Sequence, residues 1–479
     1  MLFNTVRFFI FFLIIYGLYL FLDRKRQNIL LLLASYVFYC FWDWRFLSLI
    51  LLSTAFNYIL GLKIEEGGTP EKKRKFLVLS VCLNLAMLGF FKYFNFFIGN
   101  MEAFLGLFGF NPGPVFFNIV LPLGISFYTF QAMSYPIDIY RGVIKPTRNP
   151  LDFALFVAFF PQLVAGPIER ARNLLPQFEN DRVLTLDRFY KGCWLVFWGL
   201  FKKIVIADNI AKFTDVAFGG GIGFYTGGAA LIATLLYSIQ IYADFSGYSN
   251  MARGFAKMMG IDLMVNFRAP FFSHNLYDFW QRWHISLTTW IKEYVYYPIA
   301  LGKYWGKRLA APVVVVVTWA IMGFWHGAAW KFIVWGIYHG ILLVIYSRIR
   351  PYLKAFIPGG KIATGILDVA KMIFVFLLFS VGILFFAMGS TVAVAGVLKG
   401  IATDIFTWNW VTLGQTGIVT LIGLLIPLLA MEYFQYSTGD EEIIFKCPVI
   451  VRGLIYFLIL FLIITYGDFG GKEYYYFQF

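Results

Sequence analysis

The stretch Ala311–Tyr346 reads APVVVVVTWAIMGFWHGAAWKFIVWGIYHGILLVIY and is almost uninterrupted in its apolar character. At roughly twenty residues per crossing, it is long enough for two short membrane spans, or for one long and one broken span. His326 lies inside it, within IMGFWHGAAW (Ile321–Trp330). An imidazole is costly inside a membrane, so its presence indicates proton transfer or ligation. The alternative is a structural histidine that is hydrogen-bonded to a neighbouring backbone carbonyl.

The composition of the whole chain agrees with this stretch. Of its 479 residues, 60% are hydrophobic, only 14% are charged and 21% are aromatic. Only helices and closed barrels satisfy their backbone in lipid, and the apolar runs are too continuous for barrel strands. We therefore expect an all-α polytopic membrane protein with about eleven to thirteen membrane segments, some of them re-entrant. The absence of an internal repeat or linker predicts one integral-membrane domain over residues 1–479.

Charged residues and cysteines narrow the class further. The net charge is +14, but the basic residues lie in short loops, where they set membrane orientation and do not indicate nucleic-acid binding. The first run, Thr5–Leu22, is followed by DRKR, which predicts an uncleaved helix with the N-terminus outside. The four cysteines lack CxxC spacing and predict neither a zinc site nor a disulfide framework.

Some segments carry specific structural predictions. The runs Asn28–Phe41 and Leu47–Leu62 indicate a short pair of spans, and Val115–Met133 indicates a later crossing. Phe153–Pro167 is short and contains Pro161. We expect it to be a re-entrant segment that is buried in protein or lines a wet cavity.

The segment DFWQRWHISLTTW, which starts at Asp278, contains a second histidine, His284. If the segment is helical, Asp278 pairs with Arg282 and Trp280 stacks on His284, because both pairs are four residues apart. Two interpretations stay open. One is an interfacial helix with a structural ion pair, and the other is a second histidine in an aromatic pocket near His326.

A third cluster lies in QIYADFSGYSN, which starts at Gln240. Tyr237, Gln240 and Asp244 share one helical face, and a carboxylate at the end of an apolar run needs a partner. Asp244 has two open roles: it binds substrate or orients a histidine, or it caps or braces a broken helix.

The other two histidines are expected to be structural or interfacial. His339 would lie about 20 Å from His326 on one continuous helix, and on a different face. His274 is expected at the membrane interface. No histidine pair has HxxxH spacing, and no acidic or cysteine cluster accompanies them, so we expect no metal site. GxSxG and Walker motifs are also absent. The remaining candidates are histidine-driven proton transfer at a hydroxyl or thiol, and a transport pathway.

Four motifs occur in order along the chain: QIYADFSGYSNMARGFAKMMGI, NFRAPFF, DFWQRWHISLTTWIKEYVYYP and GFWHGAAW. Together they resemble the membrane-bound O-acyltransferase (MBOAT) superfamily, and most closely its bacterial alginate O-acetylation branch. LPLGISFYTFQAMSYPIDIYRG, FFPQLVAGPIER and the terminal YYYFQF extend the resemblance over most of the chain. The chain departs from the branch at Ile299–Lys303, where a Gly-Gly-Asn-Arg-like turn is common, and at Arg268, where an acidic residue is frequent.

The resemblance implies a ring of tilted helices around a central channel. It divides the chain into N-terminal helices (1–115), a core (about 116–350) and C-terminal helices (351–479). It implies that acyl groups move from a cytoplasmic thioester towards an outer acceptor, with a separate extracytoplasmic acyltransferase as partner, in a bacterial inner membrane. His326 corresponds to the near-invariant family histidine, and His284 to the second one.

We therefore expect a membrane O-acyltransferase that moves acetyl groups from acetyl-CoA to a polysaccharide, either alginate or another exopolysaccharide or cell-wall glycan, without a permanently bound cofactor. His326 suits a general base, or a residue that carries or orients the acyl group, and His284 would position the thioester or share the proton. The residues expected to line the channel or support the histidines are Asp244, Gln240, Tyr237, Asp278, Arg282, Trp325 and Trp280.

The sequence leaves two questions open: which thioester is the acyl donor, and how deep His326 lies in the membrane. Donor phosphates need cations, and the candidates are Lys202, Lys203, Arg253 and Lys257, although such residues also set topology. D-alanyl transfer to teichoic acid from a carrier-protein thioester is one rival function, and a proton-coupled transporter is another. A turn near Gly327–Lys331 would place His326 close to one membrane face. We favour a helix that faces an internal channel, because donor and acceptor must meet.

Overall fold

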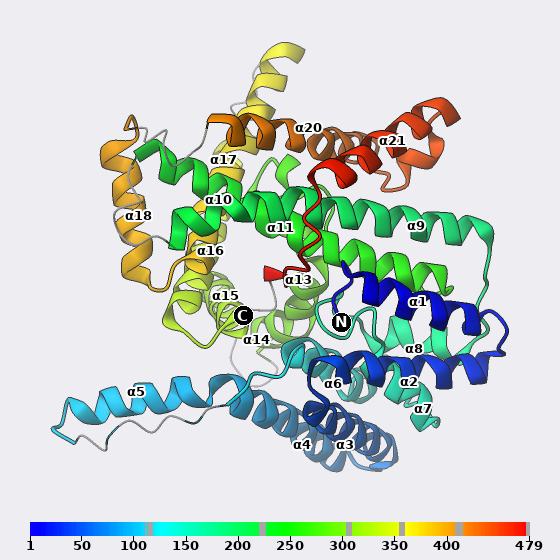
Figure 1. The fold of residues 1–479 in the computed structure, drawn as a ribbon. Helices are drawn as coiled ribbons and strands as arrows, with labels where there is room; N and C mark the ends of the chain where they lie inside the picture. Colours follow the sequence, from blue (N-terminus) through cyan, green and yellow to red (C-terminus); the bar gives the residue numbers. More distant parts are fainter. Residues whose placement is uncertain are drawn as a thin grey trace. The chain divides into compact units, whose positions relative to one another are not determined.

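The computed structural model describes residues 1–110, 113, 117, 119–219, 227–302, 309–353, 360–407 and 415–475. Over these residues the regular structure is helical, without a strand (Figure 1), which confirms the predicted all-α class. The chain folds as two compact units. The first contains Met1–Val196 and Met251–Met264, and the second contains Phe197–Asn250 and Val265–Phe479. The division at residues 115 and 350 stays a prediction.

The first unit begins with helices whose starts are fixed by capping side chains. Thr5, Asp23 and Thr69 each accept a backbone N–H at the start of a helix, which satisfies a donor that the helix itself leaves unpaired. The helices are α1 (Val6–Tyr19), α2 (Arg24–Asp43), α3 (Leu47–Glu66), α4 (Pro70–Leu88), α5 (Phe94–Gly106), α6 (Ile125–Tyr140), α7 (Pro150–Ala158) and α8 (Ala171–Glu179). The predicted pair over 28–41 and 47–62 is confirmed as α2 and α3, joined by the short turn Trp44–Phe46.

The predicted crossing Val115–Met133 is wrong in its boundaries. Part of it lies outside the described residues, and residues 119–124 are not helical. Helix α6 starts only at Ile125, after Gly124 adopts a left-handed backbone with φ 75°. A Cβ at Gly124 would lie 2.7 Å from the carbonyl oxygen of Leu163, so this turn packs directly on the neighbouring backbone. Apolar composition marked the segment but could not show that the chain turns before the helix begins.

The segment around Pro161 is broken and buried, as predicted. Helix α7 ends at Ala158, and the chain then runs irregularly through Phe159–Arg170 with every residue buried. Glu169 accepts the backbone N–H of Met264, which belongs to the same unit. Non-helical backbone is tolerated at membrane depth only where protein covers it, so this burial meets the condition for a re-entrant segment. Its depth in a membrane stays a prediction.

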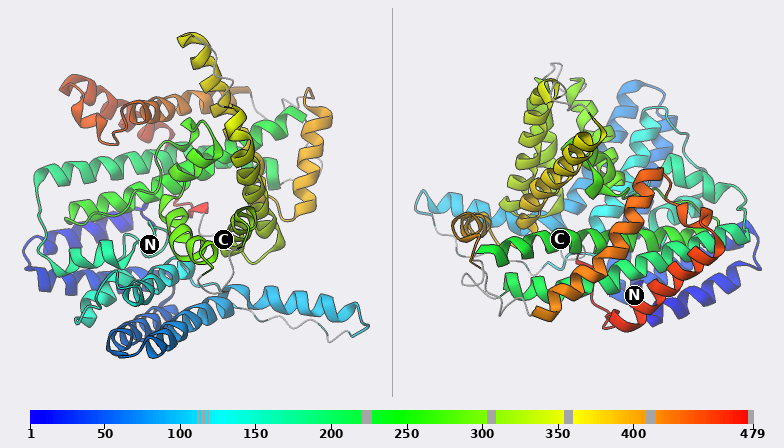
Figure 2. Two further views of the ribbon diagram at one scale, coloured as in Figure 1. Left: turned by 180° about the vertical axis from the view of Figure 1, so that it is seen from behind. Right: turned by 90° about the horizontal axis from the view of Figure 1, so that it is seen from above.

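The second unit holds the histidines. The division between the units falls within α9 (Leu186–Leu200) and within the long helix α11 (Gly227–Met258). The π-helical turn Phe201–Ala207 joins α9 to α10 (Asp208–Gly219). The other helices are α12 (Leu276–Arg282), α13 (Ile285–Ile291), α14 (Tyr297–Ala300), α15 (Ala311–His326), α16 (Trp330–Leu353), α17 (Lys361–Ala387), α18 (Thr391–Asp404), α20 (Gln415–Thr438) and α21 (Val449–Tyr466). Figure 2 shows these segments from two further sides.

Many of these helices suit a membrane. Seven helical stretches among the described residues are long and apolar enough to cross one, and the paired helices α2 and α3 count as a single stretch. The shorter apolar helices α1 and α15 add to them. These observations support a multi-pass integral membrane protein. The total of eleven to thirteen segments, the inner membrane and the outward N-terminus stay predictions.

Candidate active site

A tightly packed helical hairpin presents His326. Helix α15 ends at His326, Gly327 is extended, and α16 begins at Trp330. The chain therefore turns after His326, which is the alternative that the sequence analysis above did not favour, and the depth of His326 in a membrane stays a prediction. A Cβ at Gly323 would lie 2.1 Å from the carbonyl oxygen of Phe332, so the two helices approach backbone to backbone. This contact fixes the end of α15, and with it the imidazole.

A sharp backbone turn presents His284. The predicted helix through the segment from Asp278 is wrong, because α12 ends at Arg282 and α13 starts only at Ile285. His284 lies between them in a left-handed conformation with φ 44° and ψ 51°. That region is unfavourable for a side chain with a Cβ and is a recurrent sign of strain at functional sites. The i,i+4 stacking predicted for Trp280 and His284 therefore does not apply.

Asn266 fixes the orientation of His284. Its Oδ1 lies 3.0 Å from His284 Nδ1 and accepts from both the backbone N–H and the hydroxyl of Ser286. Its Nδ2 donates to the Ser249 hydroxyl at 3.1 Å. Because the amide oxygen faces two other donors, Nδ1 of His284 is assigned as the protonated nitrogen, which places the lone pair of the ring on Nε2. In the sequence, Asn266 lies within NFRAPFF and carries no local signal of this role.

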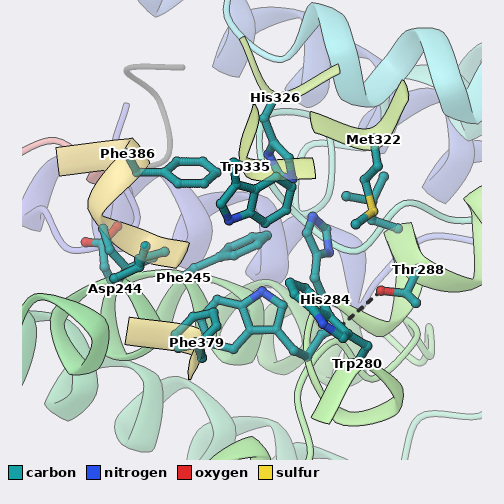
Figure 3. A pocket seen from close by; sticks show the side chains of 14 residues that line it. Asp244, Phe245, Trp280, His284, Thr288, Met322, His326, Trp335, Phe379 and Phe386 are labelled. Carbon is teal, nitrogen blue, oxygen red and sulfur yellow. Dashed lines mark hydrogen bonds between the residues drawn. The ribbon is translucent and has the colours of Figure 1, made fainter. Parts of the chain in front are cut away.

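The two histidines and Asp244 line one cavity. His284 is 2% exposed and His326 is 7% exposed. Figure 3 shows the two imidazoles pointing into the same space from different walls, with Trp335 beside them. The lining is Ile241, Asp244, Phe245, Trp280, Trp283, His284, Leu287, Thr288, Met322, His326, Trp335, Phe379, Ile383 and Phe386. The predicted aromatic pocket that holds both histidines is confirmed.

Burial in this apolar cavity sets the charge of His284, which lies outside the candidate spans. Desolvation lowers the pKa of His284 to about 3. The imidazole is therefore neutral at physiological pH and able to accept a proton or a hydrogen bond. His326 packs edge-on against Trp335 and Phe386, with ring centroids 5.1 and 5.4 Å apart. Two imidazoles in a largely apolar cavity suit proton transfer more than metal binding, and the described residues contain no metal-binding group of three or more His, Cys, Asp or Glu.

Asp244 stands at the inner end of a buried ion-pair network. Helix α11 continues unbroken to Met258, so the alternative that Asp244 caps or braces a broken helix is wrong. Lys203 Nζ lies 2.7 Å from Asp244 and 2.9 Å from Asp208. Burial raises the pKa of Asp208 to about 6, although Lys203 opposes that rise. The backbone N–H of Tyr475 donates to the second oxygen of Asp244 at 2.8 Å, so the C-terminal tail reaches this network.

The structure argues against two of the four proposed donor-docking cations. Lys202 and Lys203 are 3% and 1% exposed, and Lys202 pairs with Glu432 at 2.8 Å. Both lie in the π-helical turn Phe201–Ala207, which turns them inward, whereas the sequence suggested a surface loop. Lys257 lies 3.5 Å from Asp262 near the surface, so its docking role stays a prediction, as does that of Arg253.

The other predicted residues lie outside the cavity lining. Asp278 and Arg282 form the predicted ion pair, 2.8 Å apart and each 28% exposed at the side chain. Gln240 accepts from the Thr214 hydroxyl at 2.5 Å, and Tyr237 packs edge-on against Tyr475. Trp325 lies behind His326, with ring centroids 5.0 Å apart. Their supporting roles stay predictions.

The expected separation of His339 from His326 is wrong. Because the chain reverses after His326, α16 brings His339 back beside α15. The ring of Trp335 packs against both imidazoles, with centroids 5.1 Å from each. One indole, and not about 20 Å of helix, separates them.

Comparisons with known proteins identify the family of this chain. A model of the membrane-bound O-acyltransferase family matches residues 45–388. The "Probable alginate O-acetylase" of Azotobacter vinelandii is 44% identical over 348 residues, which cover 72% of this chain and 68% of that protein. The peptidoglycan O-acetyltransferase of Helicobacter pylori is 38% identical over 383 residues, 72% of this chain and 70% of that protein. The teichoic acid D-alanyltransferase of Bacillus subtilis is 30% identical over 254 residues, 50% of this chain and 62% of that protein. This chain belongs to the membrane-bound O-acyltransferase family.

Proposed function

We propose that this O-acyltransferase moves acetyl groups from cytoplasmic acetyl-CoA towards a polysaccharide on the outer side of a bacterial inner membrane. The observation that carries the proposal is that His284, His326 and Asp244 line the same cavity. The acetyl group and the polysaccharide acceptor are inferred from the relatives that are named as O-acetylating enzymes. Family membership favours the enzyme over a proton-coupled transporter.

In the proposed reaction, His326 is the general base. A hydroxyl oxygen of the acceptor attacks the thioester carbonyl while His326 removes the hydroxyl proton. The carbon–sulfur bond then breaks, and His326 returns the proton to the departing thiolate, so the reaction consumes no net proton. His326 is the last residue of α15, and the partial negative charge at a helix C-terminus stabilises the imidazolium that forms.

His284 and Asp244 have supporting roles in this proposal. The Nε2 lone pair of His284 accepts a hydrogen bond from the acceptor hydroxyl, or passes its proton towards His326. Asn266 holds the imidazole in the required tautomer. Asp244 keeps Lys203 neutralised at the edge of the cavity. The aromatic walls exclude water, which would otherwise hydrolyse the thioester.

Replacement of His326 tests whether this residue is the general base. In membranes that contain equal amounts of folded protein, we expect His326→Ala and His326→Gln to abolish acetylation of the polysaccharide. The matched control is His274→Ala, because His274 is half-buried and its ring contacts Tyr436, outside the cavity lining. Normal acetylation by His326→Gln would end the proposal for this residue.

D-alanyl transfer is the second candidate, because the Bacillus subtilis relative is a teichoic acid D-alanyltransferase. The two candidates differ in donor. Purified protein in lipid nanodiscs is supplied with radiolabelled acetyl-CoA or with a D-alanyl carrier-protein thioester, and thiol release is measured. Turnover of the D-alanyl thioester without turnover of acetyl-CoA would show that the donor is the carrier-protein thioester.

A separate extracytoplasmic acyltransferase partner is also proposed, and the test is co-purification with the protein from the native membrane.

A further inference from the structure

His339 occupies a fully buried position behind the cavity. It lies on α16 and packs edge-on against Trp280 and Trp335, with ring centroids 4.9 and 5.1 Å away. Trp319 covers a further side, at 5.7 Å. Within the described part of the chain, neither ring nitrogen has a protein hydrogen-bond partner. Its visible interactions are therefore ring contacts, and a buried nitrogen without a partner is costly enough to need an explanation.

The two indoles that contact His339 are part of the cavity wall. Trp280 and Trp335 both line the cavity that holds His284 and His326, and Trp335 also packs against His326 at 5.1 Å. A displacement of His339 therefore changes the cavity through these indoles, although His339 itself is not part of the lining.

A glycine on the neighbouring helix makes room for the imidazole. A Cβ at Gly382 on α17 would lie 2.4 Å from His339 Nε2 and 3.0 Å from Cε1. Ordinary contact begins near 3.4 Å, so even a methyl group there must push the ring by about 1 Å. The ring can yield only against its aromatic neighbours, since it is 0% exposed.

We propose that His339 is a positioning residue, which sets the size of acyl group that the cavity accepts by holding Trp280 and Trp335 in place against a glycine at position 382. Removal of the imidazole lets the indoles retreat and widens the cavity. Added bulk at Gly382 pushes the ring forward and narrows it. The two changes therefore alter selectivity in opposite directions.

The test is a competition between two donors. Membranes from cells that express each full-length variant receive equimolar [14C]acetyl-CoA and [3H]propionyl-CoA, and the ratio of the two esters is measured on the extracted polysaccharide. This ratio does not depend on the amount of active protein, so a loss of stability alone leaves it unchanged. One methylene in an apolar pocket changes selectivity by roughly tenfold or more.

We expect His339→Ala to raise the propionyl-to-acetyl ratio by about tenfold, and Gly382→Ala to lower it. Gly365→Ala is the matched control on the same helix, because nothing lies within 4 Å of its Cβ. In the double variant, Gly382→Ala should add nothing to His339→Ala, since the ring with which it clashes is gone. His339→Phe keeps a ring and should preserve the ratio better than His339→Ala does.

Three results would overturn the proposal. One is a wild-type ratio in both His339→Ala and Gly382→Ala. Another is full additivity in the double variant. The third is an equal loss of turnover in His339→Phe and His339→Ala with an unchanged ratio, which would indicate a chemical role instead. The inference rests on the proposed acetyl-CoA donor. If the wild-type protein incorporates neither label, the donor proposal fails and this one is measured with the thioester that the nanodisc assay identifies.

Discussion

The contact between α15 and α16 gives a quantitative prediction at Gly336. A Cβ at this position would lie 2.1 Å from the carbonyl oxygen of Trp319 and 2.8 Å from its carbonyl carbon. These are backbone atoms, so no side-chain rotation relieves the clash. Gly336→Ala must move the helices apart by about 1.3 Å to restore ordinary contact at 3.4 Å.

The displacement reaches the site directly. Trp319 is two helical turns before His326 on α15, and Gly336 follows Trp335 on α16. Overpacking of this kind costs about 1–3 kcal/mol of unfolding free energy. A misplacement of about 1 Å lowers turnover by roughly 100-fold. We therefore expect kcat/KM of Gly336→Ala to fall about 100-fold, even in protein that remains folded.

The assay is acetyl-CoA turnover by purified protein in nanodiscs, normalised to the folded fraction from thermal unfolding. Gly365→Ala is the control, because its Cβ meets no atom within 4 Å. Alanine in an open helical position should leave activity unchanged and add up to about 1 kcal/mol of stability. The reasoning is refuted if Gly336→Ala matches Gly365→Ala in both activity and melting temperature.

Three further predictions concern the cavity and its support. His284→Asn keeps a residue that tolerates φ 44° but removes the imidazole, so acetyl transfer should fall strongly while the melting temperature changes by only a few degrees; undiminished transfer would contradict this. In the wild type, the depressed pKa of His284 means that its contribution to stability is complete above pH 6.5 and declines as the pH falls from 6.5 towards 3, by at most about 1.4 kcal/mol per pH unit. Melting curves from pH 7.5 to 5 should show a smaller loss in His284→Asn, and identical losses would exclude the linkage. Asp244→Ala should cost about 1–3 kcal/mol, the cost of a lost hydrogen bond at a buried group, because Lys203 loses one buried partner but keeps Asp208. Asp278→Ala breaks a partly exposed pair and should cost less than about 1 kcal/mol by thermal unfolding. Equal losses of unfolding free energy in the two variants would show that burial does not determine how much these ion pairs stabilise the fold.

The sequence alone identified the two central histidines. His326 stands out because an imidazole is rare in an apolar run, and His284 because it lies in an aromatic segment that resembles the family motif. The long apolar runs likewise determined the all-α membrane class, since hydrophobicity is a property of composition and needs no knowledge of distant contacts. The broken segment at Pro161 could also be predicted from the sequence, because proline acts locally on the backbone.

The tertiary structure decided what these residues contact. The left-handed turn at His284 has no signal in DFWQRWH, where spacing favoured a continuous helix. Lys202 resembled a loop cation, yet its partner Glu432 is 230 positions away in the sequence. On one continuous helix His339 would lie far from His326, but the reversal after His326 leaves one indole between the two imidazoles. Sequence patterns report local preference, whereas the partner of a buried polar group depends on which helices meet, and packing of the whole unit decides that.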